Sequence, residues 1–269
     1  MPDEDVMLIA QLSDTHVLGA NKTQFLDNNA AAEAIIESLN AERPRPGLVL
    51  ATGDLTNWGL EQEYETLSRI FAELEIPVLP LVGNHDSRDR TKLAFPETPW
   101  VEANHASWVV PYDNLTIIGL DSTSPGVHGG VFDDYRAVWL KDQLQRAPTQ
   151  VLLAMHHPPF RTGVEWMDAS GFAGVEKLCD LIGEFSHQIT RVLCGHFHRP
   201  VTTTVANVTA SVCLAGSFHV ELDLRRGAPR SLIRDPRGYQ LHRLDGESLV
   251  THTRYVQTGE TPFEPDWEE

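Results

Sequence analysis

Five short apolar runs in this sequence each end in a cluster of aspartate, asparagine or histidine, and this recurrence constrains the fold more than any other feature. The runs cover residues 6–12, 48–52, 78–82, 151–155 and 190–194. Short apolar runs of this length are typical of buried strands. In layered α/β proteins, polar groups that follow strands collect at the carboxyl edge of the sheet. We therefore expect the five clusters to meet at one site.

Helical segments alternate with these runs. Apolar residues recur at helical spacing in residues 28–42, 61–74, 135–145 and 174–185. Further strands are predicted at 107–110, 115–120, 201–206, 211–214, 239–243 and 249–256, with an irregular region after residue 83 and a frayed tail at 260–269. The pattern predicts an α/β protein with two packed sheets and helices outside. Residues 1–200 form the expected core, and 201–269 form a β-rich part that completes the sandwich and is a candidate cap for oligomer formation.

Charge and composition exclude several classes of protein. Of 269 residues, 38 are acidic and 21 are basic, which gives a formal net charge of −17. Sequence-independent nucleic-acid binding needs a surplus of lysine and arginine, so we expect no stable nucleic-acid partner. No apolar stretch approaches a membrane span, so we expect no membrane partner. Three cysteines without a CxxC spacing and an acidic N-terminal segment without a signal peptide predict a cytoplasmic protein.

The residue types in the clusters are those of a mixed nitrogen and oxygen metal site. Asp14 and His16 are two residues apart, so they share one face of an extended segment, and Asp54 offers two oxygens with which to bridge two ions. Such a donor set without sulfur suits iron, manganese, zinc or cobalt. The candidate metal ligands are Asp14, His16, Asp54, Asn84, His156, His196 and His198.

Each cluster taken alone also has an ordinary interpretation. Gly53 and Asp54 after a strand would suit a turn or a helix cap. His156 and His157 would suit a pair of core histidines. It is the occurrence of all five clusters in order, each after a predicted strand, that favours a metal site.

The order Asp-x-His, Gly-Asp, Gly-Asn-His-Asp, His-His and Gly-His-x-His resembles the calcineurin-like metallophosphoesterase superfamily. The forms Leu-Ser-Asp-Thr-His, Gly-Asn-His-Asp and Met-His-His-Pro-Pro are similar to those of class III cyclic nucleotide phosphodiesterases and the related glycerophosphodiesterases. The resemblance spans Asp14 to His198. It implies a four-layered α/β/β/α sandwich, with a β-rich C-terminal extension in this chain, and two divalent or transition metal ions per chain.

The resemblance also implies a role for each matched residue. By this resemblance, the first metal is bound by Asp14, His16 and His198. The second metal is bound by Asn84, His156 and His196, and Asp54 bridges the two metals. His85 is the candidate catalytic residue, as a general acid or as a stabiliser of charge in the transition state. The candidate substrate-binding residues are Asn84, His85 and His219, while Asp86 and His157 are expected to orient their neighbours.

The activity implied is hydrolysis of a small phosphodiester, a 3′,5′-cyclic nucleotide or a glycerophosphodiester, by a hydroxide that the metals activate. The alternatives are a phosphomonoesterase, nucleotidase or protein phosphatase on the same core, and a metal-binding scaffold without catalysis. Every ligand position is filled, which disfavours the scaffold. The resemblance favours a homo-oligomer. The sequence leaves open the physiological substrate, the metal in each site, the oligomeric state, and the roles of Arg199 and of a lid-like segment at 160–174.

Overall fold

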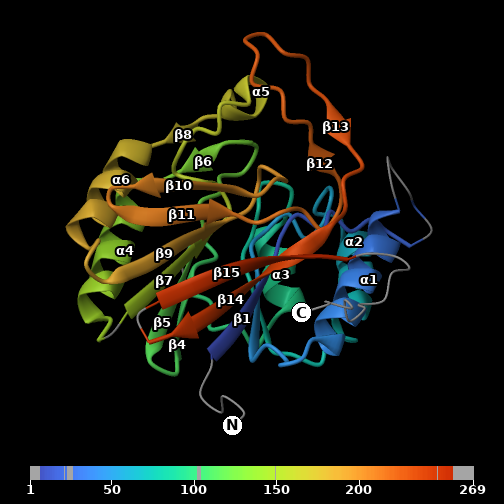
Figure 1. Cartoon of the computed structure of the whole chain (residues 1–269), viewed down its shortest axis with the longest axis horizontal. Coiled ribbons are helices and arrows are strands. Elements are labelled where there is room, and N and C mark those ends of the chain that lie inside the picture. The colour runs from blue at the N-terminus through green and yellow to red at the C-terminus, as the bar shows by residue number, and fades with distance from the viewer. Residues whose placement is uncertain are drawn as a thin grey trace, which may run out of the picture.

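The computed structural model describes residues 7–20, 22, 27–101, 104–148, 150–246 and 248–256. Its first sheet has the strand order β15-β14-β1-β2-β3 (Figure 1). These strands are β1 (Met7–Leu12), β2 (Leu48–Ala51), β3 (Val78–Pro80), β14 (Gly238–Asp245) and β15 (Ser248–Tyr255). The first three run parallel, and β14 joins antiparallel to β1.

The second sheet has the order β10-β11-β9-β7-β5-β4. Its strands are β4 (Trp108–Tyr112), β5 (Leu115–Leu120), β7 (Gln150–Met155), β9 (Ile189–Cys194), β10 (Val201–Val205) and β11 (Val208–Val212). Strands β5, β7 and β9 are parallel, and β11 lies parallel to β9. Strands that follow residue 200 therefore extend both sheets.

The two sheets pack face to face and helices cover the outside, which confirms the expected α/β/β/α sandwich (Figure 1). Ile9, Trp108 and Leu152 belong to the apolar core between the sheets. Helices α1 (Asn28–Ala41) and α2 (Glu61–Phe71) pack on the first sheet, and α4 (Asp134–Arg146) and α6 (Val175–Glu184) pack on the second. Each helix buries the apolar stripe that its sequence period predicts.

Two details differ from the sequence expectations. The region after residue 83 holds a helix, α3 (Arg88–Ala94), in which only Thr91 is buried, so it has no apolar stripe to reveal it. Strand β11 begins at Val208, earlier than predicted, because Ala206 and Asn207 form a two-residue turn with φ of 47° and 69°. Turns with two positive φ angles suit tight hairpins.

Short elements complete the carboxyl edge of the sandwich. They are β6 (Gly130–Val131), α5 (Glu165–Asp168), β8 (Phe172–Ala173), β12 (His219–Val220) and β13 (Leu232–Ile233). All three cysteines are free thiols. Within the described ranges, no helix is both long and apolar enough to span a membrane. The tail predicted at 260–269 lies outside the described residues, and the homo-oligomer stays a prediction.

Candidate metal centre

The five clusters meet at the carboxyl ends of the strands, where their backbones are tied to one another. The loops after β1 and β2 are joined by hydrogen bonds from Asp14 N to Gly53 O and from His16 N to Asp54 O, each 3.0 Å. Across the sandwich, the backbone N–H of His196 donates to both carboxylate oxygens of Asp14 at 3.1 Å. The two sheets are thus joined at the site itself.

The first group of candidate ligands is fully enclosed. Donor atoms of Asp14, His16, Asp54 and His198 all lie within 4.8 Å of one another. The Nε2 atoms of His16 and His198 are 3.1 Å apart, and His198 Nε2 is 3.3 Å from Asp14 Oδ1. Two imidazole nitrogens and two carboxylates that converge in a buried site are the arrangement expected around a cation.

The second set of candidate ligands includes His156 and His196, whose ring nitrogens lie within 4.8 Å of each other and of a ring nitrogen of His157. His156 Nε2 lies 3.3 Å from Asp54 Oδ2, at an angle that makes no hydrogen bond. Among the described residues, His156 Nε2 and Asn84 Oδ1 are buried without a hydrogen-bond partner. Buried polar atoms are nearly always satisfied, so these two unpartnered atoms fit ligands of a second cation. His196 lies beside them, its ring centroid 5.2 Å from that of His156.

His157 is adjacent to the second group and has both ring nitrogens engaged. Its Nδ1 pairs with Ser122 Oγ at 2.9 Å, and its Nε2 donates to the His128 carbonyl at 3.1 Å. Burial, helped by the charge of His156, lowers the pKa of His157 to about 3. The ring is therefore neutral and held by two contacts, and its orienting role stays a prediction.

The protonation states suit metal binding. Burial and the neighbouring imidazoles lower the pKa values of His16 and His196 well below the ordinary range, so both rings are neutral. Burial opposes charge on His156, but Asp54 raises its pKa to about 9. Burial also opposes charge on Asp54, yet His156 and His85 hold its pKa well down. The negative charge that would keep a proton on His156 would equally hold a cation.

Asp14 behaves differently, because burial is the largest influence on it and raises its pKa. A buried carboxylate is costly without a compensating charge. A cation between Asp14 and His198 would supply that charge.

Backbone strain is concentrated at the candidate ligands. Of the eight described residues other than glycine with a left-handed backbone, five are candidate ligands: Asp14 (φ 52°), His16 (44°), Asp54 (50°), His196 (74°) and His198 (55°). This conformation costs a residue other than glycine about 1–2 kcal/mol, and it is tolerated mainly at functional sites. Gly83 is required for a related reason, since a Cβ there would lie 2.1 Å from Asp54 Oδ1.

Backbone carbonyls orient two of the histidines. His156 Nδ1 donates to Thr52 O and His198 Nδ1 donates to Phe218 O, each at 2.8 Å. These contacts leave Nε2 of each ring as the nitrogen available to a metal ion, as in known histidine–metal sites. Phe218 also packs on His198 with ring centroids 4.6 Å apart.

Asp86 holds the loops after β2 and β3 together. Its carboxylate accepts from Gly83 N and Thr56 N at 2.9 Å and from Leu55 N at 3.1 Å. Burial, together with Asp54, raises the pKa of Asp86 to about 6. The orienting role expected of Asp86 stays a prediction.

His85 lies at the open side of the ligand groups. Its backbone N–H donates to Asp54 Oδ1 at 2.9 Å, and its ring lies edge-on to that of His16 with centroids 4.7 Å apart. Its Nδ1 donates to the Asn57 carbonyl at 2.6 Å. The ring is thus oriented, and Nε2 is the nitrogen left to meet a substrate.

Sequence reasoning missed two side chains at this open side. His128 is exposed, and its Nδ1 accepts from Asn84 Nδ2 at 3.4 Å, which directs Asn84 Oδ1 away from His128. Trp58 is 61% exposed, with its ring centroid 6.2 Å from that of His85. His128 follows no strand-end cluster, so only the path of its loop brings it here. Trp58 lies four residues after Asp54 in the sequence, and this short distance from a candidate ligand is the one sequence feature that could have placed Trp58 near the site.

The remaining predicted residues lie around the edge of the site. His219 is buried in β12, and burial, with the charge of His198, lowers its pKa to about 4. Arg199 Nη1 donates to Val220 O at 2.8 Å and lies 3.5 Å from Asp235 Oδ2, so it is committed to β12 and its surroundings. The segment 160–174 holds α5 and β8 and borders a hollow of about 600 Å³ that His157 and His196 also line.

Comparison with known proteins shows the family of this chain. The family model of the calcineurin-like phosphoesterases matches residues 7–200. The chain therefore belongs to the calcineurin-like phosphoesterase family, which confirms the resemblance seen in the sequence. Proteins of this family use divalent metals.

Among its relatives, a protein of Arcobacter nitrofigilis named as a probable glycerophosphodiester phosphodiesterase is 36% identical over 96% of each chain. A 3′,5′-cyclic adenosine monophosphate phosphodiesterase of Pseudomonas aeruginosa is 31% identical over 97% of this chain and 94% of that protein. A dimetal phosphatase of Danio rerio shares the fold, with a TM-score of 0.68 at 12% identity over 93% of this chain and 96% of that one.

Proposed function

We propose that this protein is a metal-dependent phosphodiesterase that hydrolyses small phosphodiesters. The observation that carries the proposal is the convergence of seven buried or half-buried Asp, Asn and His side chains, three of which (His16, Asn84 and His156) have a buried polar atom without a hydrogen-bond partner. Asp14, His16 and His198 would hold one cation, Asn84, His156 and His196 a second, and Asp54 both. The names of the two sequence relatives, both phosphodiesterases, support the same reaction. The donor set suits iron, manganese, zinc or cobalt.

Two bound cations would neutralise the phosphate oxygens and supply the nucleophilic water. The side chain of His85 would meet the substrate from the open side, because its Nδ1 is fixed on the Asn57 carbonyl and its Nε2 is available. In its protonated form, His85 would give a proton to the departing alkoxide. General acid catalysis of this kind contributes about 10²–10⁴-fold to rate.

The arginines near the site favour diesters over monoesters. A phosphomonoester carries nearly two negative charges at neutral pH and is commonly held by arginine forks. Here Arg88 is paired with Asp121 at 2.5 Å, Arg90 donates to the Gly59 carbonyl, and Arg199 is committed to Val220. The net charge of −17 adds repulsion for a dianion.

The test is kcat/KM of the metal-loaded protein for bis(p-nitrophenyl) phosphate against p-nitrophenyl phosphate, with cyclic AMP and glycerophosphoethanolamine assayed in parallel. We expect the diester to be preferred at least tenfold. A tenfold preference for the monoester, which is about 1.4 kcal/mol of transition-state binding, would overturn the assignment and favour a phosphatase.

A further inference from the structure

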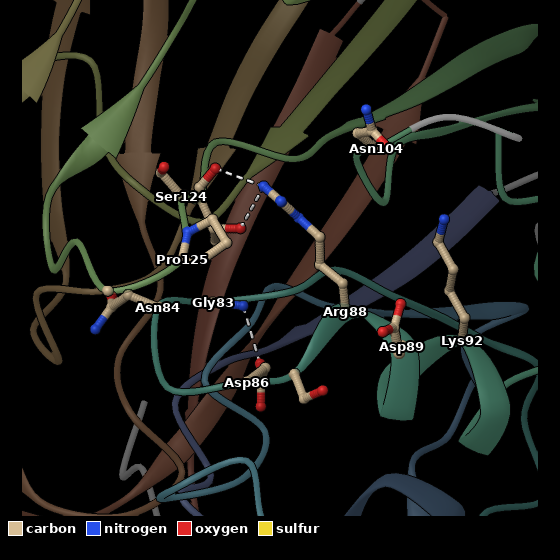
Figure 2. Close-up of a pocket in the computed structure, with 12 residues that line it drawn as sticks. Gly83, Asn84, Asp86, Arg88, Asp89, Lys92, Asn104, Ser124 and Pro125 are labelled. Carbon is tan, nitrogen blue, oxygen red and sulfur yellow. Dashed lines mark hydrogen bonds between the residues drawn. The ribbon is translucent and has the colours of Figure 1, made fainter.

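A polar pocket of about 440 Å³ lies directly beside Asn84 (Figure 2). Residues of α3, namely Arg88, Asp89 and Lys92, form one wall, and Asn104 and Ser124 stand on the other. Gly83 and Asn84 belong both to the pocket wall and to the loop that carries a candidate metal ligand. A phosphate held at the metal centre would therefore have one ester arm within reach of this pocket.

Arg88 is part of the structure of the wall. Its Nε donates to Asp121 Oδ2 at 2.5 Å, and its Nη2 donates to the carbonyl and the hydroxyl of Thr123 at 2.6 and 3.1 Å. Figure 2 shows this side chain crossing from α3 to the 123–125 segment. These bonds fix the shape of the pocket and leave Arg88 little capacity for a ligand.

Lys92 is placed differently. It stands one turn further along α3 than Arg88, so both side chains leave the same face of the helix. Its Nζ makes two long hydrogen bonds, at 3.4 Å to Val101 O and 3.3 Å to His105 O. In the part of the chain that the structure describes, no carboxylate lies within 4.0 Å of it. A lysine ammonium group has three N–H donors, so one of them is available to a ligand oxygen.

The pocket lining offers both hydrogen-bond donors and hydrogen-bond acceptors, which is the combination that a hydroxyl group needs. Lys92, the Asn104 amide and the Ser124 hydroxyl donate hydrogen bonds, while the Asp89 carboxylate and the Asn104 carbonyl oxygen accept them. A hydroxyl group uses both kinds of partner. A second anionic group would face Asp89 and the net charge of the chain, and a purely apolar arm would leave the polar wall unpaired.

We propose that this pocket binds a hydroxylated alcohol arm of the glycerol class, and that Lys92 is the residue that selects it. The proposal rests on the proposed phosphodiesterase function, whose cations hold the phosphate. Lys92 is a specificity residue here, since it would touch the substrate away from the reacting atoms.

The experiment uses two synthetic diesters with the same p-nitrophenyl leaving group. One carries a 2,3-dihydroxypropyl arm and the other a propyl arm, so that the pair differs only in hydroxyl groups. The readout is the ratio of their kcat/KM values for formation of the open-chain alkyl phosphate, corrected for spontaneous hydrolysis, so that attack of the arm's own 2-hydroxyl group on phosphorus is not counted. Lys92→Met and Asn104→Ala are the test variants. Lys141→Met is the matched control, because Lys141 is a surface lysine of α4 paired with Glu184.

We expect the metal-loaded wild-type protein to prefer the dihydroxypropyl ester about tenfold, and Lys92→Met to lose most of that preference. Asn104→Ala should lose part of it, and Lys141→Met should keep it. An unchanged ratio in Lys92→Met would overturn the proposal, as would a wild-type preference for the propyl ester or a stronger preference for an arm with a carboxylate. If the wild-type protein hydrolyses neither ester nor bis(p-nitrophenyl) phosphate, the proposed function itself is wrong.

Discussion

The interior of the candidate site and its open side are built in opposite ways. Asp14, His16, Asp54, His196 and His198 are buried and hold left-handed backbone conformations. On the open side, the described backbones of Asn84, His85, His128 and Trp58 are free of positive φ, and these side chains are half-buried or exposed. Strain and burial thus coincide at five of the seven candidate ligands. Of the other two, His156 is buried with an ordinary backbone, and Asn84 lies on the open side, where a substrate must enter and leave.

The strongest test of this division is Asp54→Ala. Asp54 contacts both ligand groups, at 3.7 Å to His16 and 3.3 Å to His156. We expect loss of both metals and a fall in kcat/KM on the order of a thousandfold, because several kcal/mol of charge stabilisation depend on the cations. Elemental analysis and diesterase assays measure the two effects.

Asp113→Ala is the matched control for this change. Asp113 also has a left-handed backbone, with φ 54°, but it is exposed in the turn between β4 and β5. It should keep full metal content and activity. Retention of both metals by Asp54→Ala would contradict the assignment of Asp54 as the shared ligand.

His85→Ala tests the open side. We expect the metal content to stay unchanged and kcat to fall about 10²–10⁴-fold for diesters with alkoxide leaving groups. The loss should shrink for p-nitrophenyl esters, whose leaving group needs no proton. Equal losses for good and poor leaving groups would instead indicate phosphate binding, and loss of metal would move His85 into the interior set.

His128→Ala should have a smaller effect. His128 contacts Asn84 and no other candidate ligand among the described contacts. Removal of an outer partner of a metal ligand typically costs about 10–100-fold in activity or metal affinity. Substitution of the exposed His187 by Ala is the control. A His128→Ala protein with wild-type kinetics and metal affinity would show that Asn84 is oriented without it.

His242 is a buried histidine that lies outside the candidate metal site. It is fully buried in β14, yet its Nδ1 pairs with Thr251 Oγ1 at 2.9 Å and its Nε2 with Gln11 Oε1 at 3.1 Å. Burial lowers the pKa of His242 to about 3, so the folded protein keeps this ring neutral. Below the unfolded pKa of about 6.5, the unfolded state binds the proton more readily, and stability falls as pH drops.

The expected size is about 1 kcal/mol of unfolding free energy between pH 7.5 and pH 5.5, lost in the wild type and not in His242→Gln. Urea unfolding at the two pH values measures it, and the difference between the two proteins removes the shared contribution of other groups. Equal slopes in the two proteins would show that His242 does not supply this pH dependence.

The sequence predicts the interior better than the open side, for a physical reason. Ligands such as Asp14 and His198 stand directly after strands, and parallel strands carry their ends to one edge whatever the loops do. His128 and Lys92 reach the site through a loop and through a short helix with one buried residue. Their positions depend on tertiary packing that no short pattern encodes.

Residue type also leaves some histidines ambiguous. His156 and His157 are adjacent in sequence and equally enclosed, yet only His156 has a ring nitrogen without a partner. That distinction needs the Ser122 hydroxyl and the His128 carbonyl, which come from a different part of the chain. From the sequence, His157 is expected to orient its neighbours. The physical basis for that expectation is seen only in the contacts that occupy both of its ring nitrogens.

Two cations at this site are proposed to make the protein a phosphodiesterase. A titration of Mn²⁺ into metal-stripped protein, with bound metal and hydrolysis of bis(p-nitrophenyl) phosphate followed together, measures their contribution. We expect no activity without metal and a plateau close to two ions per chain. Full activity in the metal-free protein, or a plateau of activity in Asp54→Ala equal to that of the wild type, would contradict this proposal.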